Sequence, residues 1–274
     1  MKPLRTFIIA ALLSILTPGA LLAQFEALRV VDLPAVGAWA EYLVTRRNES
    51  QRIVMSQRVS FLGRQLLEDG EHYWFQIEME SDDYGPKRVP IVTQIALRRE
   101  DALSRRDYFR KIGEMLVQVR TGDAPIFRIG RASLAVGVDR NLLTGGERGA
   151  GTDVEYALRD LEPESVRTPA GEFLCEHRKG IGKAEVVLSP EDGGRYPVDA
   201  ILELWTSTSV PFGLVKQVAQ QKGAGPQTEG LSLTIDTEET TELVACGAGA
   251  ASALLGPIVD YDPALASRLA GGRN

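Results

Sequence analysis

Apolar and polar residues alternate with a period of two over much of the chain. The clearest alternation covers residues 72–80, where the apolar positions are Tyr73, Phe75, Ile77 and Met79. This period is typical of a β-strand with one buried face and one solvated face. Residues 37–47 and 53–62 form two earlier apolar segments, and short polar turns separate all three. The spacing predicts an antiparallel meander of three strands.

Similar segments follow through the rest of the chain and bring the expected number of strands to about nine or ten. They comprise residues 88–98, 154–161, 173–179, 184–188, 200–207, 213–220 and 231–244. Pro169 and Gly171 mark one tight turn between them, and Pro211 and Gly213 mark another. The pattern therefore predicts a mainly β fold.

One segment breaks this pattern. Its apolar residues fall near helical spacing, at Ala102, Phe109, Ile112 and Leu116. The spacing predicts a short helix from about Ser104. Six basic side chains lie between positions 98 and 111. They fit either a patch for anionic lipid head groups or a solvated helix face, and the acidic residues among them favour the solvated face.

The N-terminal residues have the pattern of a secretory signal peptide. Lys2 and Arg5 precede an apolar run over residues 7–16, and small residues lead to Ala23. We expect cleavage after Ala23 and a periplasmic or secreted protein, with an uncleaved N-terminal anchor as the alternative. No later stretch reaches the roughly 20 apolar residues of a membrane-spanning helix.

The expected domain organisation follows from the signal and the strands. Removal of residues 1–23 leaves 274 − 23 = 251 residues, within the range of one large β domain. We expect the signal peptide at 1–23, a single β-rich domain at 24–246 and a loosely held tail at 247–274. The sequence leaves the oligomeric state open.

The net charge bears on nucleic-acid binding, and the two cysteines bear on whether the chain holds a disulfide. The formal net charge is −6, which makes nucleic acid an unfavourable partner because its phosphates would repel the protein. The two cysteines are Cys175 and Cys246, and in an oxidising compartment a disulfide between them is chemically permitted. The alternative is two separate buried thiols.

The sequence offers few groups for catalysis. The only histidines are His72 and His177, and we expect His72 to be solvated on the polar face of its strand. Cys175 lies two residues before His177, which suggests either a thiol nucleophile with its base or half a metal site. No second cluster completes a metal site, and this spacing on a strand does not suit proton transfer. We therefore assign no catalytic residue, no metal and no cofactor.

Three sequence motifs resemble those of a known family. They are Thr168-Pro169-Ala170-Gly171-Glu172-Phe173, then Trp205-x-Ser207-x-x-Val210-Pro211-x-Gly213-Leu214-Val215-Lys216, and later Glu242-Leu243-Val244. Over residues 160–246 the chain resembles a group of uncharacterised secreted bacterial β proteins that look like relatives of the lipoprotein-carrier superfamily of LolA and LolB. The resemblance implies a curved antiparallel sheet or half-open barrel, with one or more short covering helices around an apolar cavity. Residues 100–118 are where such a helix would lie.

The resemblance also implies a ligand class. The carriers bind the acyl part of lipoproteins, so we expect a non-enzymatic protein that binds a lipid or lipoprotein acyl chain in a concave sheet. The tryptophans Trp39, Trp74 and Trp205 are candidates to line the cavity, although aromatic residues on half-buried strands also form cores. The alternative function is a structural or interaction protein of the cell envelope, with no small-molecule ligand.

Overall fold

The computed structural model of the chain is a single open sheet of twelve strands. It describes residues 33–48, 51–81, 90–98, 116–123, 125–129, 157–187, 195–228 and 231–260. The predicted signal peptide therefore lies outside the described residues. The strands are β1 (Trp39–Arg47), β2 (Arg52–Leu67), β3 (Gly70–Ser81), β4 (Ile91–Arg98), β5 (Leu116–Thr121), β6 (Ile126–Ile129), β7 (Ala157–Thr168), β8 (Gly171–Val187), β9 (Arg195–Thr206), β10 (Leu214–Thr228), β11 (Leu231–Gly247) and β12 (Ile258–Asp260).

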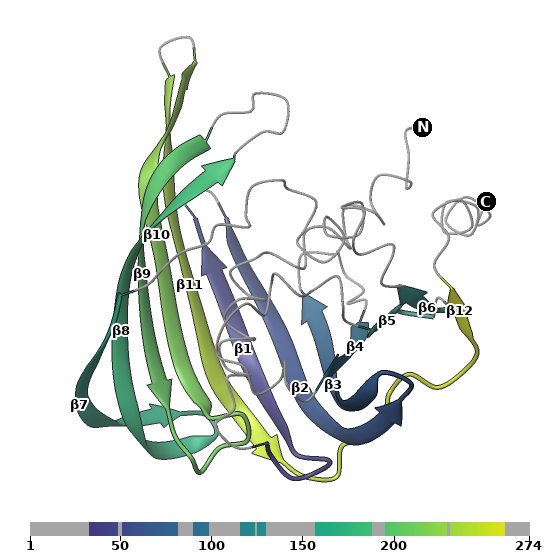
Figure 1. Cartoon of the computed structure of the whole chain (residues 1–274). Helices are drawn as coiled ribbons and strands as arrows, with labels where there is room; N and C mark the ends of the chain where they lie inside the picture. The colour runs from purple at the N-terminus through teal and green to yellow at the C-terminus, as the bar shows by residue number, and fades with distance from the viewer. Residues whose placement is uncertain are drawn as a thin grey trace.

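The chain enters the sheet in its middle and fills it in two passes. Strands β1 to β6 run in sequence toward one edge, and β7 to β11 start at the opposite edge and return until β11 pairs with β1. Neighbouring strands are antiparallel except β12, which pairs with β6 in parallel. Figure 1 shows the resulting curve, with the long strands β7 to β11 on the left and the short strands β4, β5, β6 and β12 on the right. The mainly β fold, the curved sheet and the first meander are confirmed.

The two faces of the curved sheet differ in composition. We call the concave face the inner face and the convex face the outer face. Alternate residues of each strand point to opposite faces, and the apolar set of β3, which runs from Tyr73 to Met79, belongs to the inner face. The main core cluster draws on this face from both halves of the sheet, including Tyr42, Val59, Phe61, Phe75, Ile95, Leu202 and Leu204.

A turn between β9 and β10 links the two halves of this core. Gly213 accepts a hydrogen bond from the Ser207 amide at 2.8 Å, and its own amide donates to the Val210 carbonyl at 2.9 Å. Phe212 has a φ of 66°, a backbone conformation that non-glycine residues seldom adopt. Its buried ring lies 6.5 Å from the ring of Phe75 on β3. We attribute the unusual backbone to this burial, since the packing holds the residue in place.

Residues 248–257, which we call the strap, join β11 to β12 along the outer face. Gln94 on β4 donates to the Ser252 hydroxyl at 2.6 Å and to the Gln76 side-chain oxygen at 2.8 Å. The Ala253 amide donates to the same Gln76 oxygen at 2.8 Å, and Leu254 packs in a small apolar cluster with Val92 and Ile126. Figure 1 shows this yellow segment following the outside of the curve to β12. Residues 250–254 of the expected tail are thus bonded and packed against the sheet, whereas residues 261–274 of it lie outside the described residues.

Several expected elements differ from the structure. Leu116 begins β5 and is not helical, and no helix occurs in the parts of the chain that the structure describes. The rest of the expected helix, including Ser104, lies outside the described residues. Strands β5, β6 and β12 were not expected, because six, four and three residues are too few to show a period. The segment 173–179 and residues 184–187 of the segment 184–188 belong to one long strand, β8, and residue 188 lies outside the described residues.

Candidate ligand-binding face

The inner face carries a broad set of buried apolar side chains from strands on both sides of β1. In β3 and β4 the buried inner residues stand opposite one another, with Phe75 across from Ile95 and Tyr73 across from Leu97. Phe61 on β2 lies 5.3 Å from Phe75 between ring centroids. On the far side, β9 contributes the buried residues Val198, Ala200, Leu202 and Leu204. The alternation in each strand places these side chains on one continuous face.

A band of polar side chains interrupts this apolar surface where β2, β1, β11 and β10 lie side by side. We call Gln57, Gln217, Thr241 and Glu239 the polar band; all four are buried. Gln217 stands opposite Thr241, Thr241 opposite Val44, and Gln57 is two residues along from Met55, which stands opposite Val44. The buried apolar Val44 of β1 separates Gln57 on one side from the band members of β11 and β10 on the other. The band therefore flanks β1 in the middle of the inner face.

Glu239 is the charged member of the polar band. Its carboxylate lies 3.3 Å from the Arg46 guanidinium on β1. Burial raises the pKa of Glu239, while the Arg46 charge acts in the opposite direction and only partly offsets it. On the same face, burial also raises the pKa of Tyr42 well above its ordinary value, and the Tyr42 hydroxyl donates to the Leu214 carbonyl at 3.4 Å. The middle of the inner face, where Glu239 and Tyr42 lie, thus disfavours the negatively charged forms of these side chains.

The structure places the three candidate tryptophans away from the inner surface. Trp39 and Trp74 alternate with buried inner residues and so lie on the outer face. Arg58 stacks 3.9 Å above the Trp39 ring, and the Trp74 indole donates to Gln65 at 2.9 Å. Trp205 is buried, but its ring takes part in a polar cluster on the outer side of β8 and β9. Their side chains, as placed, do not line the concave face.

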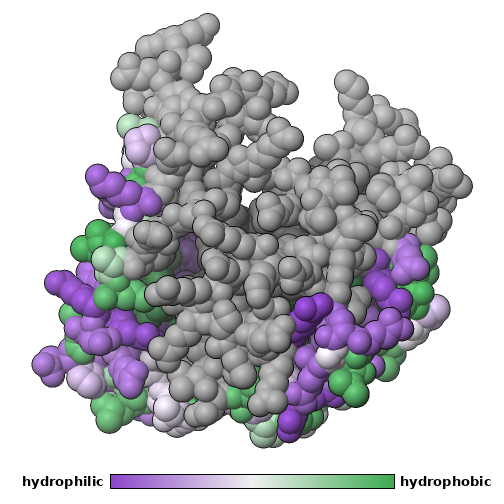
Figure 2. Space-filling view, in the orientation of Figure 1, coloured by the Kyte–Doolittle hydropathy of each residue, from purple (hydrophilic) through white to green (hydrophobic). Residues whose placement is uncertain are grey.

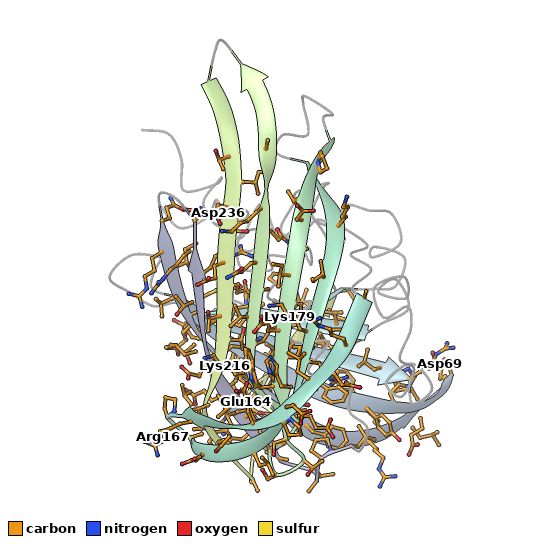
Figure 3. All side chains as sticks on the ribbon, turned by 90° about the vertical axis from the view of Figure 1, so that its left-hand side faces the viewer. Asp69, Glu164, Arg167, Lys179, Lys216 and Asp236 are labelled. Carbon is orange, nitrogen blue, oxygen red and sulfur yellow. The ribbon has the colours of Figure 1, made fainter. Side chains whose placement is uncertain are left out.

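The cluster around Trp205 brings together residues from β7, β8 and β9. The His177 ring stacks on Trp205 at 4.5 Å, with His177 Nδ1 3.2 Å from a Glu164 oxygen. The Trp205 indole donates to the same Glu164 carboxylate, and Lys179 pairs with Glu203. This Lys179 hydrogen bond, more than any other contact, lowers the pKa of Glu203. Figure 3 shows Glu164, Lys179 and Lys216 on the side of the sheet that faces the viewer.

Cys175 has no catalytic geometry with His177. The thiol is buried and donates to the Phe173 carbonyl at 3.5 Å. Burial raises the pKa of this thiol, and the Glu164 carboxylate adds to the effect, so the reactive thiolate is disfavoured. The His177 nitrogens face Glu164 and Glu203 instead. The cluster is better suited to holding β7, β8 and β9 together than to nucleophilic chemistry.

Both cysteines are free thiols in the structure, Cys175 buried and Cys246 exposed. They belong to β8 and β11, which are separated by β9 and β10. Three strand spacings amount to about 14 Å along the sheet, whereas a disulfide needs Cα atoms within about 7 Å. The structure therefore favours separate thiols over the disulfide.

His72 is buried, not solvated as its place on the polar face predicted. One ring nitrogen lies 3.1 Å from the Gly70 carbonyl, and the other lies 3.6 Å from Asp69. It closes the turn between β2 and β3. Among the described residues, no group of three or more His, Cys, Asp or Glu side chains is arranged to hold a metal ion, and no helix is long and apolar enough to cross a membrane.

The outer face of β7 to β10 has a mixed character. Figure 2 shows hydrophilic and hydrophobic residues interspersed over the left flank. Cross-strand pairs of opposite charge recur there, including Lys222 with Asp236 at 3.5 Å, and Gln220 donates to Glu238 at 2.8 Å. This flank is an ordinary solvated sheet surface, and the inner face is the stronger candidate for a binding site.

Comparison with known proteins yields weak structural likenesses. No family model matches the chain, and no curated protein matches it. A protein from Bacteroides fragilis, described as exported and with a YmcC-like fold, is 11% identical with a TM-score of 0.36, covering 78% of this chain and 97% of its own. A protein described as a lipoprotein, from Parabacteroides distasonis, is 13% identical with a TM-score of 0.32, over 78% of this chain and 97% of that one.

A third solved structure has a similar level of likeness. It is a DUF1329 family protein from Desulfovibrio piger, 10% identical with a TM-score of 0.30, covering 81% of this chain and 90% of its own. These values are too low to assign this chain to a family or to transfer a function. The case for a function therefore rests on the chain's own sequence and structure.

Proposed function

We propose that this chain is a non-enzymatic periplasmic or secreted protein that binds a lipid or a lipoprotein acyl chain on the inner face of its sheet. The observation that carries the proposal is the set of buried apolar side chains that β2, β3, β4 and β9 share on one face of an open, curved sheet (Figure 1). Burial of apolar ligand surface is worth ~25 cal/mol per Å² before the costs of binding. The signal-peptide pattern and the resemblance to lipoprotein carriers support the same location and ligand class.

Titration with a fluorescent fatty acid tests the proposal. The purified protein is first delipidated, and fluorescence is then followed as the ligand is added. Saturable binding is expected, and its absence would overturn the proposal.

A matched pair of variants locates the binding. Leu202→Gln places an amide on the inner face of β9, and Ile201→Gln makes the same change one residue earlier, on the outer face. Loss of about 1–3 kcal/mol of binding free energy is expected for the inner variant only, since its amide would be buried against the acyl chain of the ligand without a hydrogen-bond partner. Thermal melts of both variants confirm that each remains folded. Equal effects from both would place the ligand elsewhere.

A structural or interaction role in the envelope is the second candidate. The edge strand β7 supports it, because the strand is twelve residues long and mostly exposed. Pro163 and the charged side chains Arg159, Asp160 and Glu162 oppose pairing with another strand at this edge. For this reason we rank the role below ligand binding.

A further inference from the structure

The polar band holds side-chain atoms that have no hydrogen-bond partner although they are deeply buried. Gln57 is 1% exposed, and neither its side-chain nitrogen nor its side-chain oxygen has a partner among the described residues. Gln217 is also 1% exposed, and its side-chain oxygen is unpartnered in the same part of the chain. Buried polar atoms are nearly always satisfied in proteins, so each exception calls for an explanation.

The position of these glutamines shows where a partner would have to come from. Gln57 occurs in phase with Met55, Val59 and Phe61, all of which are buried on the inner face. Gln217 stands opposite Leu204, a buried inner residue of β9, and opposite Thr241 on β11. The unpartnered amides therefore belong to the face that we propose for the ligand.

The chemistry of the band selects the kind of group that would satisfy it. A glutamine amide has two donor hydrogens and an accepting oxygen, so the complementary group must both donate and accept. A carboxylate only accepts, and it would also meet the buried Glu239 carboxylate nearby. Hydroxyl and amide groups meet both requirements without bringing a charge.

We infer that the inner face binds an amphiphile with an uncharged head group that carries hydroxyl or amide groups. The head group is bound by Gln57 and Gln217 in the polar band, and the acyl chain lies along the apolar residues beside it. This inference rests on the proposed function and narrows its ligand class. Each unmet buried group carries a substantial desolvation cost, so a ligand that satisfies the two amides gains affinity over one that does not.

Three probes with the same chain length test the inference. They are monooleoylglycerol, oleate and octadecene, each added in competition with a bound fluorescent fatty acid. Wild-type protein is expected to bind monooleoylglycerol about tenfold more tightly than oleate, which corresponds to about 1.4 kcal/mol. Gln57→Leu and Gln217→Leu are each expected to remove most of that preference while leaving octadecene binding within about twofold.

Gln220→Leu is the matched control, because Gln220 is on the same strand as Gln217 but bonds to Glu238 on the outer face. It should leave the affinity for all three probes unchanged. If octadecene binds but the head group makes no difference, or if the inner variants keep the preference, the inference fails and the proposed function stands. If no probe binds, both fail.

Discussion

The two flanks of the sheet, one around β4 and the other around β8 and β10, differ in how many of their faces are buried. On one flank, β4 is buried on both faces over seven consecutive residues, Ile91 to Leu97, because the core covers its inner side and the strap covers its outer side. On the other flank, β8 and β10 are 17 and 15 residues long, with cross-strand charge pairs on an exposed outer face. The short strand β4 is covered on its outer face by the strap, whereas the long strands β8 and β10 have an exposed outer face.

The comparison predicts that core substitutions on the β3–β4 flank cost the most. Phe75→Ala removes a fully buried ring that contacts Phe61 and Phe212, and it should lower the free energy of unfolding by about 3–5 kcal/mol. Leu174→Ala on β8 is the control, since Leu174 is 74% exposed and should change stability by less than about 0.5 kcal/mol. Urea unfolding measures both. Equal effects would mean that Phe75 does not belong to the stabilising core.

Loss of the hydrogen bonds to the strap should lower the free energy of unfolding less than loss of a core side chain does, but more than loss of a surface ion pair. Gln94→Leu removes both hydrogen bonds that this side chain donates to Gln76 and Ser252, and it should cost about 1–3 kcal/mol. Limited proteolysis is expected to begin cutting within residues 248–257 in the variant. A variant with wild-type stability and an uncut strap would mean that the outer layer contributes little to this flank.

The buried Glu239 in the middle of the inner face should make stability depend on pH. Its pKa is raised in the folded state, so the folded protein binds this proton more tightly than the unfolded chain does. Its favourable contribution is full below the unfolded pKa of about 4.3 and is lost as the pH rises through the folded pKa. Glu239→Gln should therefore become more stable relative to wild type as the pH rises from acid to neutral, because it lacks the charge that burial disfavours.

Melting curves of both proteins from acid to neutral pH test this prediction. The difference in Tm should be small at the acid end and grow toward neutrality. A constant difference would mean that Arg46 compensates the charge fully, and one that shrinks as the pH rises would mean that the folded protein stabilises the charged carboxylate.

The smallest effect is expected on the outer face of the long strands. Lys222→Ala breaks an ion pair with Asp236 in which both side chains are well exposed. Such pairs contribute between about 0 and 1 kcal/mol, so chemical unfolding should barely distinguish the variant from wild type. A loss above about 1 kcal/mol would mean that this face is covered in solution.

The sequence predicted the parts of the fold in which one face of a strand is buried and the other is wet. Residues Tyr73 to Met79 show why: period-two alternation records a difference between two faces. In β4 both faces are buried, so the alternation disappears, and β5, β6 and β12 are too short to show any. The strap could not be foreseen either, because its bonds to Gln76 and Gln94 join residues more than 150 positions apart.

The candidate site was only partly accessible from sequence. The apolar face followed from periodicity, but the polar band did not, because a glutamine on an apolar face is usually read as a break in the pattern. A signal was present, since Gln57 occurs in phase with Met55, Val59 and Phe61. The tryptophans drew attention by their size, yet Trp39 and Trp74 fall on the outer face, which strand parity alone would have indicated.

Photo-crosslinking of the bound chain tests the central claim most directly. A fatty acid with a diazirine in its acyl chain is bound to the delipidated protein and activated by light, and the modified peptides are mapped by mass spectrometry. The account predicts labels on inner residues, such as Ile77 of β3 and Leu202 of β9, and none on outer residues, such as Lys183 of β8. Labels confined to the outer face or the strap would contradict it.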